Sequence, residues 1–133
     1  MEILPTYHCF DDAMDLIAER IKEDADRARS LLVVHGVAVA EDGTRYAHAW
    51  VEDGPLCWDA GILNGTRIWY AAARDEYYAA RRIEHSTAYT LQQAWEENVR
   101  TGMYGPWRED YLLLCGRSRR VLGRFQAVGP KST

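Results

Sequence analysis

Three residues in the first half of the chain are of the types that together perform thiol-based nucleophilic catalysis: Cys9, His48 and Asp59. A thiol that attacks a carbonyl carbon needs an imidazole to take and return its proton. The imidazole in turn needs a carboxylate or an amide that holds the ring in one orientation. The sequence therefore contains the chemical parts of a catalytic triad, and the fold must bring them together.

His48 and Asp59 are expected on two paired antiparallel strands. Apolar and polar residues alternate along residues 46–52, Asp53-Gly54 is a hairpin turn signal, and a second apolar segment covers residues 56–60. Alternate side chains of a strand share one face, so the carboxylate lies beside the imidazole if the two faces coincide. Taken singly, His48 can also be an ordinary half-buried strand residue and Asp59 a turn former at a strand end.

Cys9 is expected at the N-terminus of an amphipathic helix. Apolar residues recur at spacings of three and four over Phe10–Arg29, with charged residues between them. The positive end of the helix dipole lowers the pKa of a thiol, whereas the two aspartates of the first turn oppose this. A nearby imidazolium is then needed, and we rank His48 ahead of His8 as that partner. The structural alternative is that Cys9 is a small buried core residue.

The remaining segments predict an antiparallel sheet with further helices. Patterns of β-branched and alternating residues, separated by turn signals, indicate strands at residues 31–40 and 66–73, a final strand or extended segment at residues 82–90, and a loop at residues 61–65. A short helix is expected at residues 74–81. A second one begins at Thr90 with the capping-box pattern Thr90-x-x-Gln93 and ends near Gly102. Residues 111–115 are apolar enough for a last strand or a helical turn.

Composition is compatible with a single α+β domain over residues 1–133. Hydrophobic residues make up 47% of the chain and charged residues 27%, which suits a globular protein with a core. Without a signal peptide or a run of roughly 20 apolar residues, we expect a cytoplasmic protein that does not contact membranes. The three cysteines have no short repeated spacing, which indicates neither a disulfide framework nor a zinc ribbon.

Charge is unevenly distributed along the chain. The net charge of −4 argues against a general nucleic-acid-binding role. From residue 111 onward, however, the chain has basic residues and no acidic ones. A basic C-terminal tail over residues 117–133 could contact an anionic partner, or it could be a solvated end.

The order and local sequence of these motifs resemble the transglutaminase-like branch of the papain-like cysteine protease superfamily, in its small bacterial or mobile-element members. The similarity covers about residues 7–61 and lies in Cys9-Phe10-Asp11-Asp12-Ala13, His48-Ala49-Trp50-Val51-Glu52 and Trp58-Asp59-Ala60. It implies a papain-like/transglutaminase-like α+β fold, with the N-terminal helix packed on an antiparallel sheet. It also implies Cys9 as nucleophile, His48 as general base and acid, and Asp59 as the orienting residue, and it requires no cofactor.

The resemblance predicts a cysteine hydrolase (a peptidase or amidase) or a transglutaminase-like acyltransferase. Its substrate would be an amide or a thioester in a peptide, a protein or a small molecule. The backbone N–H of Cys9, with a side chain such as Tyr7, His8 or Trp50, would stabilise the oxyanion. We place Trp58 with these side chains as a substrate-binding residue.

Two alternatives remain. The residues before Cys9 lack the glycine or tryptophan often found beside the cysteine of this family, so the chain could be an inactive papain-like-fold binding module. Its five tryptophans and eight tyrosines would suit a cleft that holds a protein or small-molecule partner. A metal site built from His8, Cys9, His48 and Asp59 has no motif spacing to support it, and we expect no metal.

Overall fold

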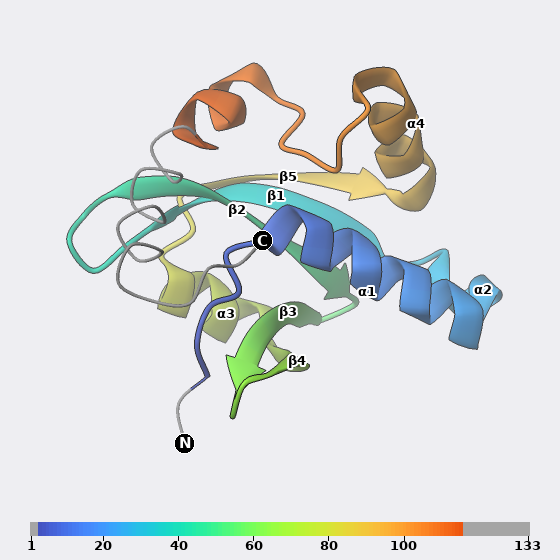
Figure 1. The fold of residues 1–133 in the computed structure, drawn as a ribbon, viewed down its shortest axis with the longest axis horizontal. Coiled ribbons are helices and arrows are strands. Elements are labelled where there is room, and N and C mark those ends of the chain that lie inside the picture. Colours follow the sequence, from blue (N-terminus) through green and yellow to red (C-terminus); the bar gives the residue numbers. More distant parts are fainter. Residues whose placement is uncertain (1–2, 116–133) are drawn as a thin grey trace.

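The structure is a computed structural model that describes residues 3–115, and its fold is α+β. The elements are α1 (Cys9–Glu23), α2 (Ala25–Ala28), β1 (Leu32–Val39), β2 (Arg45–Asp53), β3 (Leu56–Leu63), β4 (Thr66–Ala73), α3 (Arg74–Arg81), β5 (His85–Thr90) and α4 (Leu91–Thr101). The strands form one five-stranded sheet in the order β4-β3-β2-β1-β5, and all neighbouring strands are antiparallel (Figure 1).

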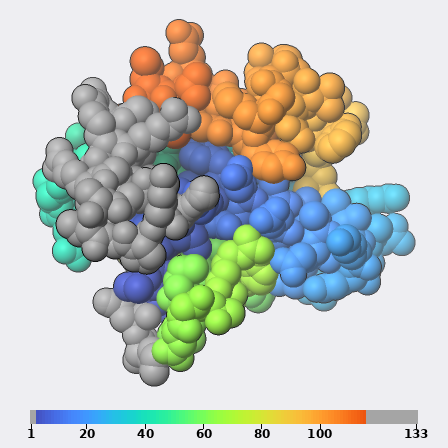
Figure 2. All heavy atoms as spheres, viewed as in Figure 1, coloured from blue at the N-terminus to red at the C-terminus, as the bar shows by residue number. Residues whose placement is uncertain are grey.

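Helices pack on both faces of the sheet. On one face, Leu16 and Ile17 of α1 are buried against Val33 and Val51, together with residues of α4. Figure 2 shows α1 on this face, between the β3–β4 hairpin and the segment that contains α4. On the other face, Tyr77 of α3 belongs to a separate buried cluster with residues of β1, β2 and β3. The α+β class expected from the sequence is therefore confirmed.

The long helix expected over Phe10–Arg29 is in fact two helices. α1 ends because the backbone of Asp24 is extended, with φ −161° and ψ 94°. The Asp24 side chain then accepts a hydrogen bond from the N–H of Arg27 and so caps α2. Aspartate favours this capping geometry over the helix interior, which explains the break in an otherwise continuous helical pattern.

Most other predicted elements are confirmed, and one loop is corrected. α3 has the predicted bounds, and α4 begins with the predicted capping box of Thr90 and Gln93. The loop expected at residues 61–65 is mostly strand, because β3 continues to Leu63 and a two-residue turn leads directly into β4. Asn64 and Gly65 both have positive φ, 54° and 79°, as that tight hairpin turn requires.

The sheet opens between β2 and β3. These two strands pair only from Val51↔Trp58 to Asp53↔Leu56, whereas β3 and β4 pair along their whole length. Figure 1 shows the β3–β4 hairpin turned away from the other strands. Residues 47–50 of β2 consequently have no partner on β3, and the backbone groups on that side of β2 are free to contact other parts of the chain.

The last described segment, residues 109–115, is helical. Tyr111 is buried against Val37, and its hydroxyl is hydrogen-bonded to His85. The expected strand or helical turn at residues 111–115 is thus a helix. The basic tail expected over residues 117–133 lies outside the described residues. Over residues 3–115, no helix is both long enough and apolar enough to cross a membrane.

Candidate functional site

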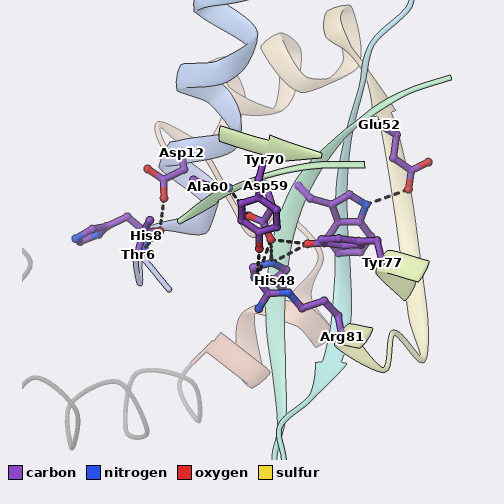
Figure 3. Close-up of polar contacts among 11 residues, drawn as sticks. Thr6, His8, Asp12, His48, Glu52, Asp59, Ala60, Tyr70, Tyr77 and Arg81 are labelled. Carbon is purple, nitrogen blue, oxygen red and sulfur yellow. Dashed lines mark hydrogen bonds and ion pairs between the residues drawn. The ribbon is translucent and has the colours of Figure 1, made fainter. Parts of the chain in front are cut away.

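A buried histidine–carboxylate pair lies where β2 and β3 diverge. His48 Nε2 is 2.8 Å from Asp59 Oδ2, and the two residues are only 7% and 5% exposed. Figure 3 shows their side chains pointing toward one another from the two strands. The expectation that the two residues share one face of the sheet is therefore confirmed. It follows from the alternation of side chains along each strand.

Asp59 accepts several other hydrogen bonds. Its Oδ2 atom also receives the hydroxyl of Tyr77 at 2.6 Å and a guanidinium N–H of Arg81 at 3.1 Å. Its Oδ1 atom accepts the backbone N–H of Ala60 at 2.8 Å. Burial by itself raises the pKa of Asp59, but the charge and hydrogen bond of His48, together with Arg81 and Tyr77, outweigh burial and hold that pKa below its ordinary value. Asp59 is therefore an ionised carboxylate.

The contact with Asp59 determines which ring nitrogen of His48 is available for chemistry. A carboxylate only accepts hydrogen bonds, so the neutral ring carries its proton on Nε2 and donates it to Asp59. The Tyr77 oxygen lies 3.0 Å from the same nitrogen. Nδ1 is then the unprotonated nitrogen, which is the one that would accept a proton from a nucleophile.

Sequence reasoning did not identify Tyr77 and Arg81. The helix that carries them was predicted, but neither residue was given a role. They lie four positions apart on α3 and so share a face of that helix. That spacing is the only local signal, and it does not indicate that the helix packs over Asp59.

Cys9 is the first residue of α1 and is half-buried. Burial raises the pKa of its thiol to about 12, against a smaller lowering by the backbone N–H of Ala49. The negative charges of Asp59 and Asp12 raise it further. The expectation that the helix terminus stabilises a thiolate is thus corrected, because the desolvation of a charged sulfur outweighs the effect of nearby donors.

The structure brings Cys9 close to the His48–Asp59 pair without joining it to the ring. The thiol interacts with the N–H of Ala49, the residue after His48, and it lies within range of the Asp59 charge. Among the hydrogen bonds of residues 3–115, none links the thiol to His48. The arrangement is therefore a formed histidine–carboxylate pair with a neutral thiol nearby.

The backbone before Cys9 is held by contacts with α1. The Thr6 hydroxyl donates to Asp12, and Arg67 of β4 donates to the same carboxylate at 2.9 Å. His8 is exposed and occupies the N-cap position of α1 without a side-chain cap, whereas Tyr7 is half-buried with a positive φ of 69°. Of the four predicted substrate-binding residues, these two lie beside the nucleophile candidate.

Trp50 is corrected from a substrate-binding residue to a core residue. Only 1% of it is exposed, and its indole N–H donates to Glu52 at 3.0 Å. It packs against the rings of Tyr77 and Tyr78 in the layer between the sheet and α3. A substrate could not reach it in this structure, and its N–H is not available to an oxyanion.

Trp58 lies on the opposite face of the sheet from Asp59. It packs against the α1 side of the core, and the guanidinium of Arg20 lies 4.8 Å from the ring centroid. It lines a pocket of about 360 Å³ with charged residues that include Arg27 and Asp53. Strand alternation explains why the side chains of Trp58 and Asp59, adjacent in sequence, point to different faces.

The described part of the chain has no group of three or more histidine, cysteine, aspartate or glutamate residues that could hold a metal ion. The four residues considered for a metal site are thus not gathered as a ligand set. No family model matches this chain, and neither a curated protein nor a solved structure matches it.

Proposed function

We propose that this protein is a cysteine hydrolase or acyltransferase that acts on an amide or a thioester. Cys9 would be the nucleophile, His48 the general base and acid, and Asp59 the residue that orients the ring. The observation that supports this most is the buried 2.8 Å contact between His48 and Asp59 beside the N-terminus of the helix that begins with Cys9. A papain-like or transglutaminase-like arrangement of these elements is part of the same proposal.

In the proposed reaction, proton transfer accompanies attack. His48 Nδ1 removes the proton from the Cys9 thiol as the sulfur bonds to the carbonyl carbon of the substrate. The ring then gives this proton to the departing amine or thiol, leaving a thioester on Cys9. Water or an amine attacks that thioester in the second half of the reaction. Asp59 holds the ring through Nε2–H and stabilises the imidazolium formed in each half.

A neutral thiol is consistent with this sequence of steps. Because burial raises the pKa of Cys9 to about 12, the resting form is the thiol and not a preformed thiolate. For the reaction, the Cys9 sulfur must come within hydrogen-bond reach of Nδ1. Catalytic hydrogen bonds commonly tighten in this way only when substrate binds.

The second candidate is an inactive module that binds a protein or a small molecule. Two observations favour it: the raised pKa of the Cys9 thiol and the pocket of about 360 Å³ beside Trp58, which lies on the other face of the sheet from Asp59. In such a protein the His48–Asp59 pair would be a structural contact.

Transfer of an acetyl group from p-nitrophenyl acetate, located by peptide mass spectrometry, separates the two candidates. A cysteine enzyme becomes acetylated on Cys9, and His48→Ala slows this by about 100-fold or more, the usual contribution of a general base. His85→Ala is the matched control, since His85 is an exposed histidine of β5 that contacts Tyr111 and has no role in the proposed site. Cys57→Ser is a second control, because Cys57 is 0% exposed.

Acetylation that is equally fast in wild type and His48→Ala would rule out the proposed mechanism. An unmodified Cys9 in the wild-type protein would favour the binding module instead. Full activity of a Cys9→Ala variant on a true substrate would also exclude a covalent role for this residue.

A further inference from the structure

One oxygen of Asp59, Oδ2, contacts three side chains at once. Oδ2 contacts His48 at 2.8 Å, Arg81 at 3.1 Å and the Tyr77 hydroxyl at 2.6 Å (Figure 3). Two side chains of α3 thus contact the oxygen that faces the imidazole. The position of that oxygen therefore depends on residues that do not belong to the triad.

Tyr77 is built to be a hydrogen-bond donor. It is 3% exposed, and burial followed by the charge of Asp59 raises its pKa well above the ordinary value, so the hydroxyl keeps its proton. The Tyr77 hydroxyl donates its proton to Asp59 Oδ2. Its oxygen can therefore only accept from Nε2 of His48, which lies 3.0 Å away. A phenol in this position favours the ring tautomer with a proton on Nε2.

Arg81 is held in place from a second side. Its terminal nitrogen that contacts Asp59 also donates to the Tyr70 hydroxyl of β4 at 2.8 Å, and its side chain is 25% exposed. The guanidinium thus bridges β3, β4 and α3. It remains charged at all relevant pH values, so its influence on Asp59 is permanent.

We propose that Tyr77 and Arg81 are positioning residues for His48: both contact Asp59 Oδ2, hold that oxygen against Nε2 of the ring, and so fix the Nε2–H tautomer. This inference rests on the proposed function, because it assigns the two residues to the orientation of the proposed general base. Its consequence is that Nδ1 of His48 stays the unprotonated nitrogen.

Arg81→Gln tests the contribution of Arg81. The ¹⁵N shifts of the His48 ring should report a mixture of tautomers in this variant, because Asp59 Oδ2 has then lost one of the contacts that hold it against Nε2. Arg82→Gln removes the same charge from the next residue, which is exposed, and should keep the wild-type Nε2–H tautomer. Arg81→Lys restores the charge and should return the shifts toward the wild-type values. Equal shifts in Arg81→Gln and Arg82→Gln would overturn the inference.

Tyr77→Phe tests the contribution of the Tyr77 hydroxyl and keeps the volume of the ring. The ¹⁵N shifts of His48 should report the Nε2–H tautomer in wild type and a mixture of tautomers in the variant. An unchanged tautomer in Tyr77→Phe would contradict the role of the hydroxyl. Neither NMR measurement requires Cys9 to react, so a failure of acetylation at Cys9 would count against the proposed function and not against this inference.

Discussion

At the scale of single residues, the central feature is a buried carboxylate that accepts hydrogen bonds from four groups. Asp59 is 5% exposed and is hydrogen-bonded by His48, Tyr77, Arg81 and the backbone of Ala60. A buried charge is tolerated only when such partners replace its lost hydration. Loss of any part of this set should therefore affect stability as well as chemistry.

Asp59→Asn should lower the free energy of unfolding by about 3 kcal/mol, because it leaves the Arg81 charge without its buried partner and sets an amide N–H against the Nε2–H of His48. Asp15→Asn is the matched control, since Asp15 is exposed and its contact with Arg67 is a surface ion pair. It should cost no more than about 1 kcal/mol. Urea unfolding measures the free energy of unfolding of both variants. Equal losses of free energy would show that the burial of Asp59 does not determine how much this residue stabilises the protein.

At the scale of elements, the site depends on where strands stop pairing. β2 and β3 separate after Val51↔Trp58, so the N-terminus of α1 can approach the N–H of Ala49. α3 closes the opposite face with Tyr77, and its position follows from the hairpin that leads into it. The site thus takes Cys9 from a helix N-terminus, His48 and Asp59 from two strands, and Tyr77 from a helix interior.

Thr90→Ala should destabilise the protein by about 1 kcal/mol, because the Thr90 side chain accepts the N–H of Gln93 in the capping box of α4. Gln92→Ala is the control, since Gln92 is exposed on the same helix and makes one long contact with Glu96 at 3.4 Å. Thermal or urea unfolding compares the two. A loss in Gln92→Ala as large as in Thr90→Ala would mean that the cap does not stabilise α4.

At the scale of the whole molecule, His35 is a polar side chain enclosed in the core. It is 0% exposed, and within the described chain neither ring nitrogen has a hydrogen-bond partner. The rings of Phe10, Tyr89 and Trp107 surround it with centroid distances of 4.7, 5.2 and 4.7 Å. Burial, and then the nearby charge of His48, lower the pKa of His35 to about 3.

Stability should therefore fall in mild acid because of His35. The folded protein keeps this ring neutral, whereas the unfolded chain takes up a proton below its ordinary pKa of about 6.5, so the contribution is present above that pH and lost toward pH 3. By pH 4 the loss should reach about 3 kcal/mol. The lowered pKa of Asp59 affects stability only below the ordinary aspartate value of 3.8, so the loss between pH 6.5 and 4 comes before the Asp59 effect.

Urea unfolding of wild type and His35→Leu across this pH range measures the effect. The variant should lose much less stability between pH 6.5 and 4, whereas His8→Gln, at an exposed position, should follow the wild-type curve. Parallel curves for wild type and His35→Leu would show that another group causes the acid sensitivity.

The sequence by itself determined the local structure and the shared face of two site residues. Strand alternation indicated that His48 and Asp59 can lie on one face, because backbone geometry sets a period of two. The turn between the strands is at residues 54–55, one position after the expected Asp53-Gly54. Capping residues correctly indicated the start of α4. The basis of these predictions is short-range, so they did not require knowledge of the packing.

Only the tertiary structure decided what surrounds those residues. It placed Tyr77 and Arg81 on Asp59 across 18 and 22 residues of sequence, buried Trp50 in the core, and directed Trp58 to the other face. It also raised the pKa of Cys9 to about 12, where the helix terminus alone predicted a lower value. Desolvation and long-range contacts depend on which distant elements pack together, and no local pattern of residues contains that information.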